Sequence, residues 1–201
     1  MIHLSSVHCI NLETRTQRWE TVSKDIQPLQ ELLGFDFVRE DAITHSTPFV
    51  GLRQTVQSIV RRAKEQSLDY VAIAEDDLFV LDPEKVKTCL ENPPDDWDLL
   101  SGGVYHYIPK KTGHTPHWKK LDDYCSMHFV IIRHTMYDRI LALEERTNID
   151  RKIGKWIKEF GYNVYVMYPM PCKQRMGYSD LRKRTVNYNY MRLPWIQRVY
   201  N

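Results

Sequence analysis

Three consecutive carboxylates, Glu75, Asp76 and Asp77, directly follow the apolar run 70–74. A continuous apolar run of this length predicts a central strand buried on both faces, so the three acids lie at its end. Because side chains alternate along a strand, Glu75 and Asp77 can face one side and Asp76 the other. Two carboxylates that converge on one point are a common way to hold Mg²⁺ or Mn²⁺. The alternative is an acidic strand end that is solvated at the surface.

The elements that must position these acids alternate between strands and helices. Apolar runs predict strands at 7–12, 35–38, 70–74, 98–100, 126–132 and 163–168. Helical periodicity predicts a helix around residues 19–26 that Pro28 interrupts, and further helices at 52–63, from residue 82, at 135–143 and at 149–160. Residues 105–124 show no period and predict a long loop. This alternation indicates an α/β fold with a mostly parallel, Rossmann-type central sheet flanked by helices.

In a sheet of this kind, ligands bind beyond the carboxyl ends of the strands. Chemistry is therefore expected at Asn11, at Glu75 to Asp77, at Gly102 and Gly103, and after Tyr168. Gly102 and Gly103 would let the backbone approach a ligand closely, although a tight turn explains them as well.

Two basic residues after the last predicted strand, Lys173 and Arg175, are candidates for binding the ligand. They would add positive charge on a mobile loop, which Gly177 allows to bend. The alternative is that both are ordinary solvated residues leading into the basic end of the chain.

Charge is unevenly distributed along the 201 residues. The chain has 28 Lys and Arg against 26 Asp and Glu, and five of the basic residues but no acid fall in residues 182–201. Residues 1–181 therefore carry a net charge of −3, which argues against a dedicated duplex-DNA binder. We expect one catalytic domain over residues 1–181. We expect the basic, aromatic tail at 182–201 to contact a membrane surface or to join a further domain.

The cysteines and the apolar segments bear on the cellular compartment. Four cysteines without a CxxC pair fit neither a disulfide scaffold nor a zinc site, and they favour a reducing environment. No apolar run approaches the ~20 residues that a membrane span needs. We therefore expect a cytoplasmic protein that is at most peripheral on a membrane.

Three segments carry a resemblance to a known family. Residues 9–19 are similar to an opening "INL-x-x-R-x-x-R" motif, residues 68–77 to "yvlilEDD", and residues 168–180 to a closing "P…Q…S-D" stretch. In this order, the segments resemble glycosyltransferase family 25, the lipooligosaccharide and collagen galactosyltransferase type, which has a GT-A fold. One departure is that the family's Ser-His pair near the start of the helix before the acids is replaced here by Gly51-Leu52-Arg53-Gln54.

The resemblance implies a set of site residues. Asp77, together with Glu75, would bind a divalent metal, Mn²⁺ or Mg²⁺, that holds the donor diphosphate. The residues implied to border the nucleotide or its diphosphate are Asn11, Leu12, Arg15, Asp41, Ala42 and Asp76. For Arg15 and Arg18, a solvated helix face is the alternative interpretation.

An inverting sugar transferase also needs a base for the acceptor hydroxyl. The leading candidate is Asp150, which opens the predicted helix 149–160 where related GT-A enzymes place their base. An acid in the first turn of a helix also stabilises the helix dipole, which is the competing explanation. Asp122 and Asp123 are weaker candidates.

Together these residues predict a metal-dependent, inverting GT-A glycosyltransferase. It would move a sugar from a nucleotide donor, UDP-linked, to a glycan or glycoprotein acceptor, and nucleic acid is not an expected partner. Two alternatives remain open: a metal-dependent nucleotidyl or phosphodiester enzyme that uses the same carboxylates, and a nucleotide-sugar-binding module without turnover.

Overall fold

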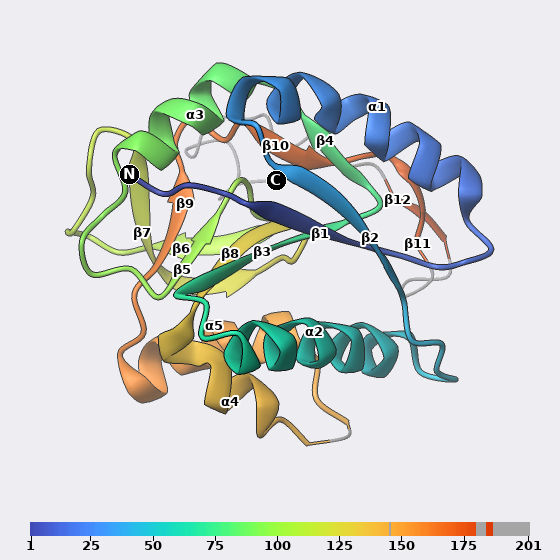
Figure 1. Ribbon diagram of the computed structural model, residues 1–201. Helices are drawn as coiled ribbons and strands as arrows, with labels where there is room; N and C mark the ends of the chain where they lie inside the picture. Colours follow the sequence, from blue (N-terminus) through green and yellow to red (C-terminus); the bar gives the residue numbers. More distant parts are fainter. Residues whose placement is uncertain (145, 180–183, 187–201) are drawn as a thin grey trace.

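A central sheet of eight strands organises the protein in its computed structural model, which describes residues 1–144, 146–179 and 184–186 (Figure 1). Its strands are β1 (Ser6–Asn11), β2 (Asp36–Asp41), β3 (Tyr70–Glu75), β5 (Leu99–Ser101), β6 (His106–Pro109), β7 (Trp118–Cys125), β8 (Phe129–Arg133) and β9 (Val164–Met167). Their order across the sheet is β2-β1-β3-β8-β5-β9-β7-β6. β8 pairs antiparallel with β3 and β5, and β7 pairs antiparallel with β9 and β6. The other strands share one direction, so the mostly parallel sheet is confirmed.

Helices cover both faces of this sheet. In Figure 1, α1 (Thr16–Leu33) and α3 (Pro83–Glu91) lie on one side, and α2 (Pro48–Glu65), α4 (Tyr137–Leu141) and α5 (Ile149–Phe160) lie on the other. The predicted central strand β3 divides its side chains between the two cores. Val71 and Ile73 pack in the core that contains α2 and α5, and Ala72 and Ala74 pack in the core that contains α1 and α3. Burial on both faces explains why the run 70–74 is uninterrupted by polar residues.

The predicted interruption of the first helix at Pro28 is wrong. α1 continues to Leu33 and ends at Gly34, whose φ of 72° is left-handed and whose N–H donates to the Gln30 carbonyl at 2.8 Å. Proline in a helix interior costs roughly 3 kcal/mol. Burial of Ile26 and Leu29, on either side of Pro28, offsets that cost, because tertiary packing supplies most of the stability of a helix in a protein.

The loop predicted for residues 105–124 is also wrong, because β6 and β7 form an antiparallel pair in this stretch. The register shifts between Ile108 and Pro109, and the buried residues along β7 are Trp118, Leu121, Tyr124 and Cys125, of which the first three are spaced three apart. This spacing of three does not match the alternation that identifies a strand in a sequence. Two further boundaries move: β8 begins at Phe129 rather than Ser126, and a 3₁₀ turn at His134–Met136 precedes α4.

Two short strand pairs lie outside the central sheet and were not predicted. β4 (Leu78–Val80) pairs with β10 (Cys172–Gln174), and β11 (Gly177–Ser179) pairs with β12 (Arg184–Val186). Apart from Arg184–Val186, the tail at 182–201 lies outside the described residues, so its role stays a prediction. Among the helices that are described, none is both long enough and apolar enough to cross a membrane.

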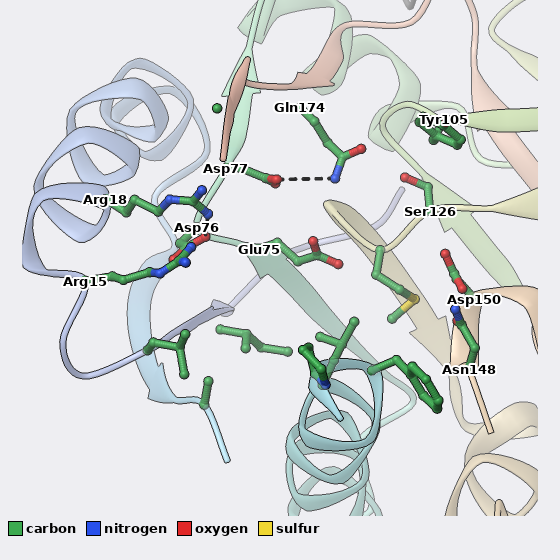
Figure 2. A pocket seen from close by; sticks show the side chains of 18 of the residues that line it. Arg15, Arg18, Glu75, Asp76, Asp77, Tyr105, Ser126, Asn148, Asp150 and Gln174 are labelled. Carbon is green, nitrogen blue, oxygen red and sulfur yellow. Dashed lines mark hydrogen bonds and ion pairs between the residues drawn. The ribbon is translucent and has the colours of Figure 1, made fainter. Parts of the chain in front are cut away.

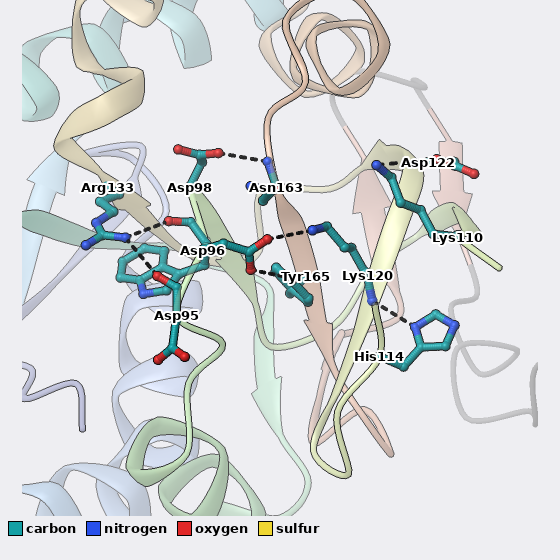
Figure 3. Close-up of polar contacts among 11 residues, drawn as sticks. Asp95, Asp96, Asp98, Lys110, His114, Lys120, Asp122, Arg133, Asn163 and Tyr165 are labelled. Carbon is teal, nitrogen blue, oxygen red and sulfur yellow. Dashed lines mark hydrogen bonds and ion pairs between the residues drawn. The ribbon is translucent and has the colours of Figure 1, made fainter. Parts of the chain in front are cut away.

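A polar network joins the amino ends of β5 and β9 (Figure 3). Glu75, Asp76 and Asp77 lie at the opposite edge of the sheet, where the parallel strands have their carboxyl ends. Asp98 accepts hydrogen bonds from the Asn163 backbone N–H at 2.8 Å and from the Thr135 hydroxyl at 2.6 Å. Asp96 accepts from Tyr165 at 2.6 Å and from Lys120 at 2.7 Å. These bonds fix the ends of neighbouring strands, and we infer that they serve the stability of the fold.

Candidate active site

A cavity of about 550 Å³ lies at the carboxyl ends of β1 and β3 (Figure 2). Its floor carries Glu75, Asp76 and Asp77. The walls come from six places: the segment after β2 with the first turns of α2, the start of α1, Tyr105 before β6, the 125–127 segment at the end of β7, the start of α5, and the 174–177 segment at the end of β10. Both the position and the size are typical of a small-molecule site in an open α/β sheet.

Asp76 is fully engaged with protein groups. It accepts hydrogen bonds from Asn11 Nδ2 and from Arg18 Nη1, each at 2.9 Å. Arg18 therefore forms an ion pair rather than a solvated helix face. Asn11 is 1% exposed and also accepts from Arg39 Nε at 3.0 Å, so it connects β1, β2 and the acidic segment from behind the cavity.

Glu75 and Asp77 lack such compensation. Burial, together with the negative charge of Asp76, raises the pKa of Asp77 to about 7. Burial and then the charges of Asp77, Asp150 and Asp76 raise the pKa of Glu75 well above its usual value. One carboxylate oxygen of Asp77 accepts from Gln174 Nε2 at 3.3 Å, and the other is buried with no hydrogen-bond partner in the described structure.

These two carboxylates fit a divalent cation. A buried acceptor without a donor, beside a second carboxylate of raised pKa, is compensated when a positive ion lies between them. Within residues 1–144, 146–179 and 184–186, no three His, Cys, Asp or Glu side chains are placed to hold a metal. The two acids leave open coordination positions, which suits Mg²⁺ or Mn²⁺ because these ions commonly keep waters and substrate phosphate oxygens as ligands.

Asp150 lies across the cavity from Glu75 (Figure 2). Its carboxylate accepts from the Cys125 thiol at 2.9 Å and from the Arg151 backbone N–H at 2.7 Å. Burial and the charge of Asp150 raise the pKa of Cys125, so this thiol stays protonated and can donate. Asp122 and Asp123 do not line the cavity, and they pair with Lys110 and His106 at 3.9 and 3.5 Å.

The structure brings most of the predicted site residues together. Those that line the cavity are Leu12, Arg15, Ala42, Glu75, Asp76, Asp77, Asp150 and Arg175. Arg175 lies at the rim, where its backbone N–H donates to the Asp77 carbonyl at 2.6 Å and its Nε donates to Asp25 at 2.8 Å.

The predicted residues that do not line the cavity are Asn11, Asp41, Gly102, Gly103 and Lys173. The Asp41 side chain is 79% exposed. A Cβ on Gly102 would lie 2.8 Å from Cys172 Sγ, and one on Gly103 would lie 2.1 Å from the Cys172 carbonyl oxygen. Close packing against the chain around Cys172 therefore explains both glycines. The Lys173 ammonium lies 5.4 Å from the centre of the Phe79 ring.

Several cavity residues carry no signal in the sequence that would single them out. Those from the segment after β2 and the first turns of α2 are Ile43, Thr44, His45, Pro48, Phe49 and Leu52. Those from the other walls include Tyr105, Ser126, Met127, Asn148 and Gln174. One indirect signal is Gly51, because a Cβ there would lie 2.2 Å from the Ile43 carbonyl oxygen. Only a glycine lets α2 pack this closely against the cavity wall.

Arg53, at the point of departure from the family 25 pattern, has a structural role. This buried side chain donates from Nη1 to the Leu143 carbonyl at 3.0 Å. Gln57 donates to the carbonyls of Ile140, Leu141 and Leu143 at 3.0 to 3.2 Å. Two side chains of α2 thus donate hydrogen bonds to carbonyls at the end of α4 and just beyond it.

Comparisons with known proteins find similarity in structure but not in sequence. No family model matches the chain, and no curated protein matches its sequence. A glycosyltransferase involved in glycosylating the major capsid of PBCV-1 aligns with a TM-score of 0.51 and 11% identity, over 80% of this chain and 79% of the other.

Two further solved structures are similar. One is a mutant of Drosophila beta-1,4-galactosyltransferase 7 in complex with manganese, UDP-Gal and xylobiose. It aligns with a TM-score of 0.57 and 10% sequence identity, over 100% of this chain and 80% of the other. The other is the inositol-1-phosphate CTP transferase of T. maritima, which aligns with a TM-score of 0.50 and 8% sequence identity, over 83% of this chain and 86% of the other. At these identities the likeness establishes the fold alone. The chain therefore has a GT-A-like fold, which glycosyltransferases and nucleotidyltransferases share.

Proposed function

We propose that this protein is a metal-dependent glycosyltransferase that moves a sugar from a UDP-sugar to a glycan or glycoprotein acceptor. The observation that carries the proposal is that two buried carboxylates of raised pKa, Glu75 and Asp77, line one cavity together with Asp150. The structures of a capsid glycosyltransferase and of a galactosyltransferase with manganese and UDP-Gal, which share the fold, support it. We also propose kinship with glycosyltransferase family 25, on the three segments that resemble it.

The donor would lie along the cavity floor. Ile43, Phe49 and Leu52 offer apolar surface for the nucleoside, and Arg15 brings positive charge to the diphosphate. Glu75 and Asp77 would hold Mn²⁺ or Mg²⁺, which as a Lewis acid neutralises the charge on the departing diphosphate. Asp76, bound by Arg18 and Asn11, would keep the acidic segment in place.

Asp150 would act as the base of a single inverting displacement. The acceptor oxygen bonds to the anomeric carbon as the bond from that carbon to the diphosphate oxygen breaks. The proton of the acceptor hydroxyl passes to Asp150, and UDP leaves. The Cys125 thiol and the Arg151 N–H hold the carboxylate in a fixed orientation for this transfer.

A metal-dependent nucleotidyltransferase is the second candidate, because the CTP transferase of T. maritima shares the fold. The two activities differ in their products. A glycosyltransferase releases UDP from a UDP-sugar, whereas a nucleotidyltransferase releases pyrophosphate from a nucleoside triphosphate.

The experiment is to measure binding of UDP-sugars by calorimetry with and without Mn²⁺, together with the release of UDP. We expect Mn²⁺-dependent binding that Asp77→Ala abolishes and that Asp36→Ala retains. Asp36 is a matched control because it is exposed at the amino end of β2, far from the acids. Absence of binding and of UDP release with every UDP-sugar would refute the proposal, whereas binding without turnover on any acceptor would identify a binding module.

A further inference from the structure

Ser126 and His128 form a buried pair in the cavity wall that faces the carboxylates. Ser126 is 4% exposed and lines the cavity, and His128 is 0% exposed behind it. The distance from Ser126 Oγ to His128 Nδ1 is 2.5 Å. Figure 2 shows Ser126 on the wall between Tyr105 and Asp150. The proposed mechanism leaves this pair without a role.

The direction of this hydrogen bond follows from the surroundings of the imidazole. His128 is 0% exposed and pairs with no carboxylate among the described residues, so the ring is neutral and carries one N–H. A Cβ on Gly103 would lie 2.1 Å from the Cys172 carbonyl oxygen and 3.0 Å from His128 Nε2, so this carbonyl lies near Nε2, although the two form no hydrogen bond of good geometry. A proton on Nε2 is favourable beside the carbonyl oxygen, whereas a proton on Nδ1 would leave the Nε2 lone pair beside it, and two acceptors repel each other. We therefore assign Nδ1 as the acceptor and the Ser126 hydroxyl as the donor.

This assignment limits what Ser126 can offer to a ligand. A serine hydroxyl has one proton and two lone pairs, and its proton is committed to His128. The oxygen can then accept a hydrogen bond from the cavity but cannot donate one. An ether, carbonyl or phosphate oxygen has no proton to donate, so it would be repelled by the lone pairs of Ser126 Oγ. The hydroxyl group of a sugar can donate its proton to that oxygen.

The place of Ser126 indicates which part of the substrate it meets. The 125–127 segment lies on the cavity wall with Asp150, opposite Glu75. In the proposed function, Glu75 lies beside the diphosphate and Asp150 beside the acceptor hydroxyl. The group between them is the sugar that is transferred.

We propose that Ser126 determines donor specificity by accepting a hydrogen bond from one hydroxyl group of the transferred sugar, and that His128 is the positioning residue that directs the Ser126 proton away from the cavity. This inference rests on the proposed function. It adds that a donor lacking the matching hydroxyl is rejected, because the Ser126 oxygen would be left buried without a donor.

The test compares UDP-galactose and UDP-glucose with their 2-, 3-, 4- and 6-deoxy analogues. For one deoxy position we expect the wild-type kcat/KM to fall by about 10- to 100-fold, as expected for one unsatisfied buried acceptor. Ser126→Ala should lower kcat/KM for the parent donor and bring the ratio at that position close to one. Ser101→Ala is the matched control, because Ser101 is equally buried but donates to the Gly103 carbonyl outside the cavity.

The role of His128 is tested by two replacements. His128→Gln keeps an acceptor near Ser126 and should retain the discrimination, whereas His128→Leu should weaken it. In the Ser126→Ala background, neither replacement should change the ratio further, which a merely structural role of His128 would not explain. The inference is overturned if Ser126→Ala keeps the wild-type ratio at every deoxy position. If the wild type neither binds nor turns over any UDP-sugar, the proposed function fails first, and this inference fails with it.

Discussion

At the residue scale, three neighbouring acids have different environments. Asp76 has an arginine and an asparagine as partners, whereas Glu75 and Asp77 have raised pKa values and little compensation. The types and spacing of the three acids could be read from the sequence. Their unequal compensation could not, because Arg18 and Gln174 reach them from distant parts of the chain.

We predict that Asp77→Asn stabilises the metal-free protein at pH 8, by about 4 kcal/mol. The folded-state pKa of about 7 lies above the ordinary value of 3.8, so folding disfavours the charged carboxylate. The stability associated with the protonated form is therefore present in acid and is lost as the pH rises through about 7. Thermal unfolding in a chelator at pH 8 measures the gain, which should shrink at pH 5. A variant less stable than the wild type at pH 8 would contradict this account.

A second residue-scale prediction separates the two explanations of Asp150. Asp150→Asn should leave donor affinity unchanged and lower kcat at least 10²-fold, because general-base catalysis typically contributes 10²- to 10⁴-fold. Calorimetry and steady-state kinetics measure the two effects. The matched control is Glu84→Gln, which removes an acid from the first turn of another helix, α3. If both variants lose only a few tenths of a kcal/mol of stability and turn over normally, Asp150 is merely a helix-terminus charge.

At the element scale, the sequence predicted the core strands and the long helices but not the β7-β6 edge of the sheet. Strands buried on both faces and helices such as α5 have a clear period, which their burial produces. The pairing of β7 with β6 shifts in register, and the buried residues Trp118, Leu121 and Tyr124 are spaced three apart, so the pattern resembled a loop. The acidic end of the cavity followed from strand ends. The apolar end did not, because it lies where a connecting segment packs on the first turns of α2.

We predict that Gly51→Ala perturbs this apolar end. The new Cβ would lie 2.2 Å from the Ile43 carbonyl oxygen, so the 43–45 segment must move. The expected loss of stability is about 1–3 kcal/mol, with a weaker affinity for UDP. Chemical denaturation and calorimetry measure both, and Glu65→Ala, an exposed change in the same helix, serves as the control. Unchanged UDP affinity in a destabilised variant would show that this wall does not contact the nucleoside.

At the scale of the whole molecule, the candidate active site and the polar network around Asp96 and Asp98 lie at opposite ends of the sheet. The cavity lies at the carboxyl ends of the parallel strands, and the network around Asp96 and Asp98 closes the amino ends (Figures 2 and 3). This division was implied by the fold class, although the partners in the network were not.

We therefore predict that Asp98→Ala lowers stability by about 1–3 kcal/mol while leaving donor binding intact. The substitution leaves the Asn163 N–H and the Thr135 hydroxyl without their acceptor. Denaturant unfolding measures the loss, and calorimetry with a UDP-sugar measures binding on the folded variant. A large fall in affinity would show that the two ends are energetically coupled.

The bonds from Arg53 and Gln57 to the end of α4 have a consequence for engineering. α2 forms one wall of the cavity, and α5, which carries Asp150, follows α4 in the chain. These hydrogen bonds therefore connect the two walls of the cavity. A mutant library that varies only the residues lining the cavity would keep Arg53 and Gln57 and retain the spacing between the walls. Replacing α2 with a helix from another protein would remove these hydrogen bonds and shift Asp150, even if every lining residue were kept.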